Sequence, residues 1–290
     1  MPYGELEPGQ IARVHLHDVV SGKDTVIYES SDVLFEAPNW SGDSLLINGN
    51  GRLWSLSVDS GAAPKLVEYE NLPPINNDHV LDPRGGAIFM SATDGKIYRG
   101  ALSGGPVKAV TDEEGVSHFL HGVSFDGERL AYVRLQSFDH PGELVLAPSA
   151  GGGEAIVMET GPGHIDGPEW SPDDAWIYFN SERWASEPGH AQLARIPHGG
   201  GEVQRLVTSD TVDWFPHISP DGRLAVYLEF PKGTIGHPPD LKVGLVIVSI
   251  DDWTTPLERI TVPGGQGTIN VNSWSPDSRS FAYVSYPVRT

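Results

Sequence analysis

The chain has 290 residues and a mass of 31.3 kDa, with 39% hydrophobic residues, 34 Gly and 24 Pro, which fits one large domain or two small ones. Its 39 acidic and 19 basic residues give a net charge of −20, which disfavours binding to nucleic-acid backbones and anionic membrane surfaces. The absence of cysteine excludes disulfides, thiolate nucleophiles and thiolate metal sites.

The N-terminal region predicts two strands and no targeting segment. Residues 1–5 lack the basic and apolar parts of a signal peptide, and no apolar run approaches the roughly 20 residues of a membrane helix. We therefore expect no membrane insertion. We expect a cytoplasmic protein as the sequence stands, or a periplasmic one if a signal peptide was removed. Residues 12–16 and 25–28 alternate in polarity and predict strands on either side of a turn.

A four-residue pattern then recurs along the chain. Its six copies are Trp40-Ser41-Gly42-Asp43, Leu81-Asp82-Pro83-Arg84, Val123-Ser124-Phe125-Asp126, Trp170-Ser171-Pro172-Asp173, Ile218-Ser219-Pro220-Asp221 and Trp274-Ser275-Pro276-Asp277. Successive copies end at residues 43, 84, 126, 173, 221 and 277, so they are 41 to 56 residues apart. This spacing indicates structural repeats with insertions.

Each copy predicts the same local structure. The large apolar residue ends a strand, Ser or Asp starts a β-turn, and Pro presets φ at the next position. Alternating segments such as 223–228 and 280–284 then predict the following strand. Gly-rich turns at 150–153 and 198–201 join two further strands. They are not phosphate-binding loops, because no Lys-Ser or Lys-Thr follows them.

Four short strands every 40 to 50 residues predict an all-β fold, a six-bladed β-propeller with four antiparallel strands per blade. We assign residues 1–290 to a single domain of this kind. After the copy at 274–277 the chain has room for only one more strand. Residues 10–30 therefore complete the sixth blade, which closes the ring and removes exposed strand edges.

The Ser-Pro-Asp turns followed by alternating strands resemble the repeats of the TolB-like propellers, which are related to WD-repeat blades. The resemblance covers residues 10–290 and implies a six-bladed propeller in a bacterial protein, without a counterpart of the N-terminal α/β domain that TolB carries. Similar blades serve binding proteins, peptidase gating domains and some lyases, so the resemblance specifies the fold far better than the function.

The predicted connections differ between the two faces of the propeller. Turns between first and second strands, and between third and fourth strands, are short and uniform. The other connections are long and irregular, which favours that face as the functional one. Of the 11 histidines, eight fall on this side: His79, His118, His121, His140, His164, His190, His217 and His237.

Histidines and carboxylates from different blades predict a site at the mouth of the central channel. The expected ligand-binding residues are His79, His121, His164, Asp166, Asp213, Trp214 and His217, with Asp78, Glu169 and Asn272 in the same connections. Neutral imidazole and carboxylate together form a normal ligand set for a divalent metal, with His79, His121 and His217 as the candidates. Alternatively, these polar residues hold ordered water and bond to neighbouring blades.

Three long loops, at 136–142, 182–190 and 231–240, combine His with Pro, Gly and acidic residues and predict a raised wall beside the channel. These loops either recognise a ligand or are insertions without a function, since long surface loops cost little free energy. Trp184 and Trp214 are expected in loops on the same face, where an indole suits a sugar ring, a peptide side chain or a cation. Packing of a neighbouring loop is the alternative role for both.

The sequence carries no Gly-x-Ser-x-Gly nucleophile elbow and no locally activated Ser-His-Asp set. We therefore expect a non-catalytic, monomeric propeller without a cofactor. It binds a protein or peptide partner on the long-loop face and the channel mouth, and its acidity favours a basic or neutral partner. The alternative is a metal-dependent lyase or hydrolase that acts on an acidic saccharide at a histidine-lined site.

Overall fold

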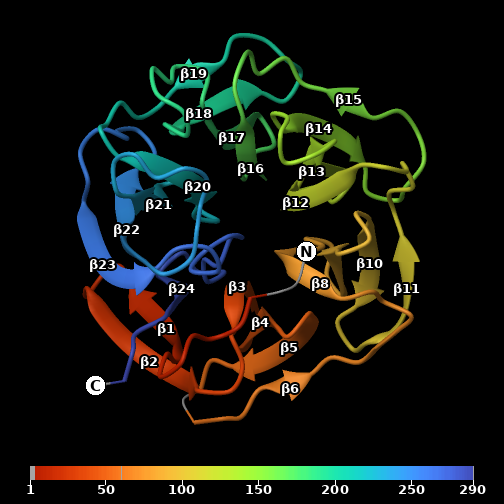
Figure 1. The fold of residues 1–290 in the computed structure, drawn as a ribbon. Coiled ribbons are helices and arrows are strands. Elements are labelled where there is room, and N and C mark those ends of the chain that lie inside the picture. Colours follow the sequence, from red (N-terminus) through yellow and green to blue (C-terminus); the bar gives the residue numbers. More distant parts are fainter. Residues whose placement is uncertain (1–3, 60, 290) are drawn as a thin grey trace.

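A computed structural model describes residues 4–59 and 61–289. It contains 24 strands and, within these residues, no helix. The strands form six sheets arranged around a common axis (Figure 1). In the first five blades, β3 to β23, the chain begins beside the axis and moves outward, because each strand pairs antiparallel with the next one. The predicted all-β, six-bladed propeller is confirmed.

The five blades that follow one another along the chain have equivalent strands. The innermost strands are β3 (Glu36–Ser41), β8 (Ile75–Leu81), β12 (Ser117–Val123), β16 (Ile165–Trp170) and β20 (Val212–Ile218). The second strands are β4 (Ser44–Gly49), β9 (Ala87–Ala92), β13 (Arg129–Leu135), β17 (Trp176–Ser181) and β21 (Leu224–Phe230). The third strands are β5 (Arg52–Ser57), β10 (Ile97–Ala101), β14 (Glu143–Pro148), β18 (Gln192–Pro197) and β22 (Leu241–Ser249).

The outermost strands are β6 (Lys65–Leu66), β11 (Gly105–Ala109), β15 (Ile156–Val157), β19 (Gln204–Arg205) and β23 (Glu258–Gly264). The second blade has one additional strand, β7 (Tyr69–Glu70), which pairs parallel with β11. Three of these outer strands have only two residues, so most of the ring's edge presents little free backbone for pairing with another chain.

The sixth blade joins the two ends of the chain. It contains β24 (Ser280–Ser285), β1 (Ala12–Asp18) and β2 (Lys23–Ser30), in that order from the axis outward. The register of β1 against β24 runs from Arg13 opposite Ser285 to Asp18 opposite Ser280. The predicted closure by N-terminal strands is therefore present. In the innermost place of this blade, residues 268–275 form an isolated bridge with β24 at Trp274 and Phe281. Ala282 and Val284 also donate their N–H groups to the carbonyl oxygens of Ser273 and Thr268.

Apolar side chains between neighbouring blades form the core. The cluster between the fifth and sixth blades, for example, includes Trp214, Phe230, Leu245, Phe281 and Tyr283, all at most 1% exposed. Such residues alternate along their strands, because successive side chains of a strand point to opposite faces of its sheet. Packing of each sheet against the next fixes the positions of the innermost strands around the axis.

The repeated pattern forms the turns between first and second strands, as predicted. In the fifth blade the Ser219 hydroxyl donates to Asp221 at 2.7 Å and accepts the N–H of Leu224 at 3.0 Å. The Asp221 carboxylate accepts the N–H of Arg223 at 3.1 Å. These turns and those between third and fourth strands lie on one side, called the turn face. The remaining connections lie on the other side, called the loop face.

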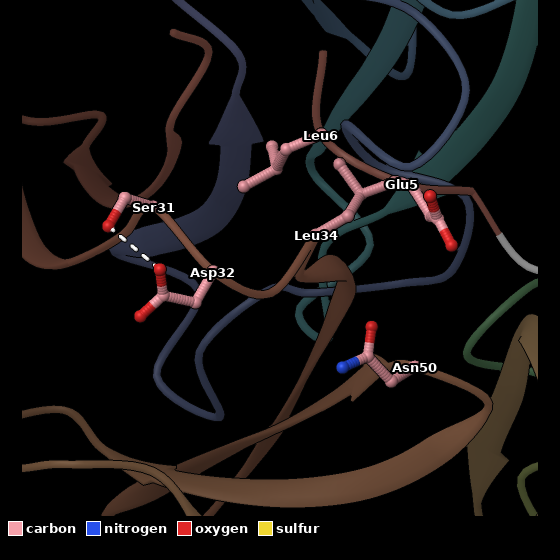
Figure 2. A pocket seen from close by; sticks show the side chains of 6 residues that line it. All are labelled: Glu5, Leu6, Ser31, Asp32, Leu34 and Asn50. Carbon is pink, nitrogen blue, oxygen red and sulfur yellow. Dashed lines mark hydrogen bonds between the residues drawn. The ribbon is translucent and has the colours of Figure 1, made fainter. Parts of the chain in front are cut away.

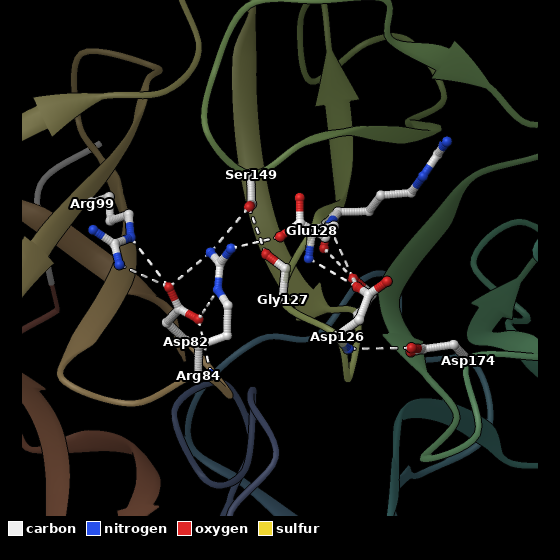
Figure 3. A network of polar contacts seen from close by, with 10 residues as sticks. Asp82, Arg84, Arg99, Asp126, Gly127, Glu128, Ser149 and Asp174 are labelled. Atoms are coloured by element: carbon white, nitrogen blue, oxygen red, sulfur yellow. Dashed lines mark hydrogen bonds and ion pairs between the residues drawn. The ribbon is translucent and has the colours of Figure 1, made fainter.

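One polar network on the turn face links the second and third blades (Figure 3). Asp82, whose side chain is fully buried, accepts bonds from the guanidinium groups of Arg84 and Arg99 at 2.9 to 3.2 Å. Arg84 also donates to Glu128 at 2.9 Å and Ser149 at 3.3 Å in the third blade. Every oxygen of this buried carboxylate is thus matched by a cationic donor.

Candidate functional site

The innermost strands are irregular at equivalent positions. All five carry a register shift against the second strand, for example between Asp166 and Glu169 in β16. Ala37, Gly167 and Phe215 have positive φ values of 49°, 60° and 53°, and each lies three residues before its copy of the repeated pattern. A β-bulge re-aims side chains and is frequent beside binding sites. Here the bulges turn polar side chains toward the axis.

Five side chains gather near the axis and are called the mouth cluster: Asp78, His121, His164, Asp166 and His237. His121 lies at its centre. Its Nε2 is 3.1 Å from Asp166 Oδ1 and 3.7 Å from Asp78 Oδ1, and its Nδ1 is 3.1 Å from the carbonyl oxygen of Asn270. All three partners accept hydrogen bonds, so both ring nitrogens carry a proton. Burial opposes this charge, but the two carboxylates outweigh it and raise the pKa of His121 to about 9.

Asp166 lies near the loop-face end of its strand. It is the second residue of β16, and innermost strands run from the loop face toward the turn face. Its Oδ1 accepts the N–H of Gly167 at 2.7 Å and pairs with His121. Burial alone would raise the pKa of Asp166, but the neighbouring imidazoles of His121 and His164 lower it well below its ordinary value. Asp166 is therefore ionised.

Two further histidines flank the other carboxylate oxygen. His164 Nε2 and His237 Nε2 lie 3.9 and 3.7 Å from Asp166 Oδ2. Gly142 donates its N–H to His164 Nδ1 at 2.9 Å, which places the proton of the neutral ring on Nε2. Burial opposes the protonation of His164, but Asp166 raises its pKa. Burial lowers the pKa of His237 to about 4, so this ring is neutral.

Aromatic rings support the mouth cluster. Phe215, which is fully buried, stacks on His121 with ring centroids 5.5 Å apart. Trp214 lies 4.6 Å from His237 and 6.1 Å from His164, measured between ring centroids. The loop at 231–240 thus reaches from the fifth blade to the innermost strand of the fourth. A low-dielectric floor of this kind strengthens the electrostatic interactions above it.

Two other carboxylates near the axis have no cationic side chain bound closely. Glu36 accepts bonds only from the amides of Asn48 and Asn77, at 3.1 and 3.2 Å. Burial raises the pKa of Glu36 to about 7, and the charge of Asp78 adds to this shift. Burial and the charge of Asp166 raise the pKa of Asp78 to about 6, although His121 opposes them.

His217 forms a second bridge deeper along the axis. Its Nδ1 is 2.6 Å from Glu169 Oε2 and its Nε2 is 2.9 Å from the carbonyl oxygen of Ile269. Glu169 Oε1 also accepts the side-chain amide of Asn272 at 2.7 Å. Together with the bond from His121 to Asn270, these contacts hold residues 268–275 of the sixth blade beside the axis, where Figure 1 shows this segment.

The three histidines considered as metal ligands are not assembled into one site. Neither ring nitrogen of His79 has a partner among the described residues, and burial lowers its pKa to about 3. The nitrogens of His121 and His217 are directed at carboxylate and carbonyl oxygens of the protein. No group of three or more His, Asp or Glu side chains within residues 4–59 and 61–289 is arranged to hold a metal ion.

Asp213 and Trp214 differ from their expected placement. Both lie within β20 and not in a loop, with exposures of 0% and 1%, because the bulge in this strand keeps them inside the blade. Asp213 accepts bonds from Ser209 and Thr211 at 2.8 and 3.0 Å, and burial raises its pKa to about 6. It belongs to a separate network behind the mouth cluster. Trp214 contacts the rings of His164 and His237 in the cluster.

The long loops of the fourth and fifth blades touch one another. A Cβ atom on Gly189 would come within 3.0 Å of Ile235 Cα. Phe138 and Ile235 stand 69% and 72% exposed on the loops at 136–142 and 231–240. A small cavity of about 90 Å³ lies between Pro188, His190, Asp210 and Lys232 on this wall. The loops at 182–190 and 231–240 are therefore in contact, and the name wall is kept for these two loops together with the loop at 136–142.

A larger hollow of about 430 Å³ opens elsewhere on the loop face (Figure 2). It lies between the N-terminal segment, the connection from β2 to β3 and the turn after β4. Its lining consists of Glu5, Leu6, Ser31, Asp32, Leu34 and Asn50. Both hollows thus lie among the irregular connections, in agreement with the expectation that this face is the functional one.

Sequence reasoning selected His121, His164 and Asp166 correctly as neighbours but missed Glu36, Phe215 and the role of His237. One signal was available for Glu36. It stands four residues before Trp40, as Asp166 stands four residues before Trp170. Equivalent positions of repeats converge on the axis, so the shared offset marks both carboxylates. The contact of His237 depends on the path of a ten-residue loop, which no repeat specifies.

Comparisons with known proteins place the chain among bacterial propellers. No protein-family profile matches it. It is 35% identical over 281 residues to the uncharacterized protein Atu1656 from Agrobacterium fabrum, covering 94% of this chain and 92% of that one. A solved structure from Agrobacterium tumefaciens, provisionally described as TolB, is 33% identical with a TM-score of 0.87 and covers 96% of this chain and 99% of that chain.

More distant structures share the fold alone. TolB from Acinetobacter baumannii is 17% identical with a TM-score of 0.56, covering 96% of this chain and 63% of that chain. An oligogalacturonate lyase in complex with manganese and a gluconolactonase from Xanthomonas campestris are 14% and 13% identical, with TM-scores of 0.57 and 0.62. They cover 96% and 99% of this chain, and 78% and 99% of theirs. No helix in the described part of this chain is long and apolar enough to cross a membrane.

Proposed function

Because the chain belongs to the family of TolB-like six-bladed propellers, we propose that it is a binding protein that holds a polypeptide partner on its loop face, around the mouth cluster. The wall of loops supplies the apolar contacts, and the cluster supplies the polar ones. Aromatic and aliphatic anchors surrounded by polar groups are the usual composition of a protein interface.

One observation carries this proposal. Phe138 and Ile235 are about 70% exposed on two loops that flank an ionised, partly buried cluster. The loop with Ile235 also supplies His237 to the cluster. Solvent exposure of such side chains costs free energy that burial under a partner recovers, at about 25 cal/mol per Å² of apolar surface. A single partner could therefore contact the wall and the cluster together.

The net charge of −20 favours a basic or neutral partner. It disfavours the acidic saccharide considered as the alternative substrate, since an anion would approach an anionic surface. The donor geometry also lacks a metal ligand set among the described residues. No observation favours the enzymatic alternative over binding.

A matched pair of double variants tests this placement. Phe138→Asp with Ile235→Asp places two charges on the wall. Phe125→Asp with Leu257→Asp does the same on the turn face, where the side chains are 69% and 62% exposed. Both pairs alter only exposed positions, so both proteins should fold as the unchanged chain does. In capture experiments from cell extract followed by mass spectrometry, only the wall pair should lose a specific polypeptide.

The comparison between the pairs decides the outcome. A loss of at least tenfold in the retained polypeptide with the wall pair, and none with the turn-face pair, supports the proposal. Equal retention by both double variants contradicts it, as does equal loss. Circular dichroism and thermal unfolding of each variant show whether a loss reflects binding or folding.

A further inference from the structure

The mouth cluster ends in a closed floor. Behind it, Phe215 covers one face of His121, and the bonds from His121 to Asn270 and from His217 to Ile269 hold the sixth blade across the axis. The side chain of Asp166 is 13% exposed, whereas that of Glu169, three residues deeper in the same strand, is 7% exposed. A group that enters from the loop face therefore meets Asp166 first.

The carboxylates of this region carry charge that no basic side chain balances. Arginine side chains form ion pairs with Asp82, Glu128, Glu143 and Glu229, all away from the axis, and Lys232 pairs with Asp210. Within residues 4–59 and 61–289, none pairs with Glu36, Asp78, Asp166 or Glu169. Histidine is the only cation that they contact. Asp78 and Asp166 share one imidazolium, so the pair retains a negative charge.

Asp166 Oδ2 is the unfilled acceptor of the cluster. Oδ1 accepts the N–H of Gly167 and pairs with His121, whereas the nearest nitrogens to Oδ2, those of His237 and His164, lie at 3.7 and 3.9 Å. These distances exceed those of hydrogen bonds. An ionised carboxylate gains most from a charged donor, because charge-assisted hydrogen bonds are about twice as strong as neutral ones.

The two imidazole rings beside Oδ2 are neutral, so they do not repel a cationic donor. His164 is neutral while Gly142 donates to its Nδ1, and His237 is neutral. His237, whose Nε2 lies 3.7 Å from Asp166 Oδ2, has its other ring nitrogen, Nδ1, buried without a partner among the described residues. Buried polar atoms are normally paired. This free nitrogen belongs to a ring beside the unfilled carboxylate oxygen, and it can accept a hydrogen bond from a donor that the described residues do not supply.

We propose that Asp166, flanked by His164 and His237, binds a cationic amine or guanidinium group of the polypeptide partner. This inference rests on the proposed function and specifies which part of the partner meets the mouth cluster. The ligand is a lysine or arginine side chain, or the N-terminal ammonium group. The floor of Trp214 and Phe215 excludes water from one side of the contact and contributes aromatic surface to the bound cation.

Small probes test the site without the partner. The protein is labelled with ¹⁵N-histidine and titrated with Nα-acetyl-lysine methylamide at pH 7.5 and constant ionic strength. Two further probes separate the possible sources of the cation. Nα-acetyl-arginine methylamide represents an arginine side chain, and norleucine methylamide, which has a free α-amine, represents the N-terminal ammonium group. Nα-acetyl-norleucine methylamide is the uncharged control. We expect saturable shifts of the His164 and His237 signals with one or more cationic probes and none with the uncharged one.

Two variants establish which residues hold the cation. Asp166→Asn should weaken the responsive probe at least tenfold, whereas Asp210→Asn, which changes an 88% exposed carboxylate of the wall, should leave it unchanged. If Asp166→Asn does not fold, the His237→Phe variant tests the cation site instead. This change keeps a ring against Trp214 and Phe215 but removes the nitrogen near Oδ2, and it should weaken binding severalfold.

Equal shifts with the uncharged probe, or unchanged affinity in a folded Asp166→Asn protein or in His237→Phe, would overturn the cation site. These results are separable from those of the capture experiment. Loss of the partner with the wall pair but no response to any cationic probe leaves the binding function and removes the cation site. If a cationic probe binds specifically but no polypeptide is retained, the cation site stands and the proposed polypeptide partner is removed.

Discussion

Asp78 and Asp82 stand at opposite ends of one short stretch of chain and have opposite surroundings. Asp82, on the turn face, accepts bonds from two guanidinium groups, and the hydrogen bonds of Arg84 and Arg99 lower its pKa although burial opposes them. Asp78, near the axis, has one shared imidazolium at 3.7 Å and a pKa raised to about 6. Both carboxylates are buried. Asp82, which links two blades, is fully paired with arginine, whereas Asp78 lacks a full balance of positive charge.

This difference separates structural from functional polar groups. A buried ion pair with complete hydrogen bonding fixes a geometry, and it tolerates the loss of neither partner. Groups with strongly perturbed pKa values that lack a full set of partners are typical of binding sites. Loss of a carboxylate charge should therefore have different effects on stability and binding at the turn face and near the axis. Three experiments measure this difference.

The largest effect is expected from Asp82→Asn. The change removes the charge that Arg84 and Arg99 share, and it should reduce the free energy of unfolding by about 3 kcal/mol, since hydrogen bonds to charged groups contribute about 1.5 to 3 kcal/mol each. Urea denaturation at pH 7 measures the change. Asp210→Asn is the control, because its exposed pair with Lys232 should contribute under about 1 kcal/mol. Equal effects in the two proteins would contradict the structural role of Asp82.

Glu36→Gln should have the opposite sign. The folded-state pKa of Glu36 is raised to about 7, so ionisation of this side chain destabilises the fold as pH rises from about 4.5 to 7. The introduced amide does not ionise, and the free Oδ1 of Asn48 can accept its N–H after rotation of the Asn48 amide. We expect a gain of about 3 kcal/mol at pH 8 and under about 1 kcal/mol at pH 5.

The pH dependence distinguishes this mechanism from a simple packing effect. Urea denaturation at both pH values supplies the measurement. A gain of similar size at pH 5 and pH 8 would show that the substitution acts through packing or hydrogen bonding and that Glu36 is not a strained anion. A loss at both values would assign Glu36 to the same class as Asp82.

The smallest effect concerns binding. Asp78 and Glu36 become anionic as pH rises through about 6 and 7, and His164 loses its proton as pH rises through its raised pKa. Each change favours a cation beside Asp166, so affinity for the responsive probe should rise about threefold to tenfold between pH 5.5 and 7.5. Calorimetric titrations across this range test the sign. An affinity that stays constant or falls as pH rises would show that these groups do not influence binding at Asp166.

The sequence predicted the scaffold well because the scaffold repeats. Six copies of one turn pattern fixed the number of blades, and the alternating strands at 12–16 and 25–28 identified the closing blade. Repetition gives every blade the same local physics, so a weak signal becomes decisive when it recurs. The face that carries the irregular loops followed from the same pattern.

The site was predicted only in part because it arises where the repeats differ. His121 and Asp166 come from similar offsets in neighbouring repeats and do lie together. Trp214 and Asp213 were misplaced because a bulge in β20, with Phe215 at a φ of 53°, keeps this stretch within the strand. A bulge on a non-glycine residue leaves no mark in composition or periodicity. The contacts of His79 likewise depend on which side of β8 it occupies.

The closing of the ring also has a consequence for how the protein is made. β1 leaves the ribosome before its partner β24, because Asp18 pairs with Ser280, which lies 262 residues further along the chain. While the residues between them are translated, β1 presents an open edge, which invites pairing with another nascent chain. The order of synthesis, and not the stability of the finished ring, sets the period of greatest exposure to aggregation.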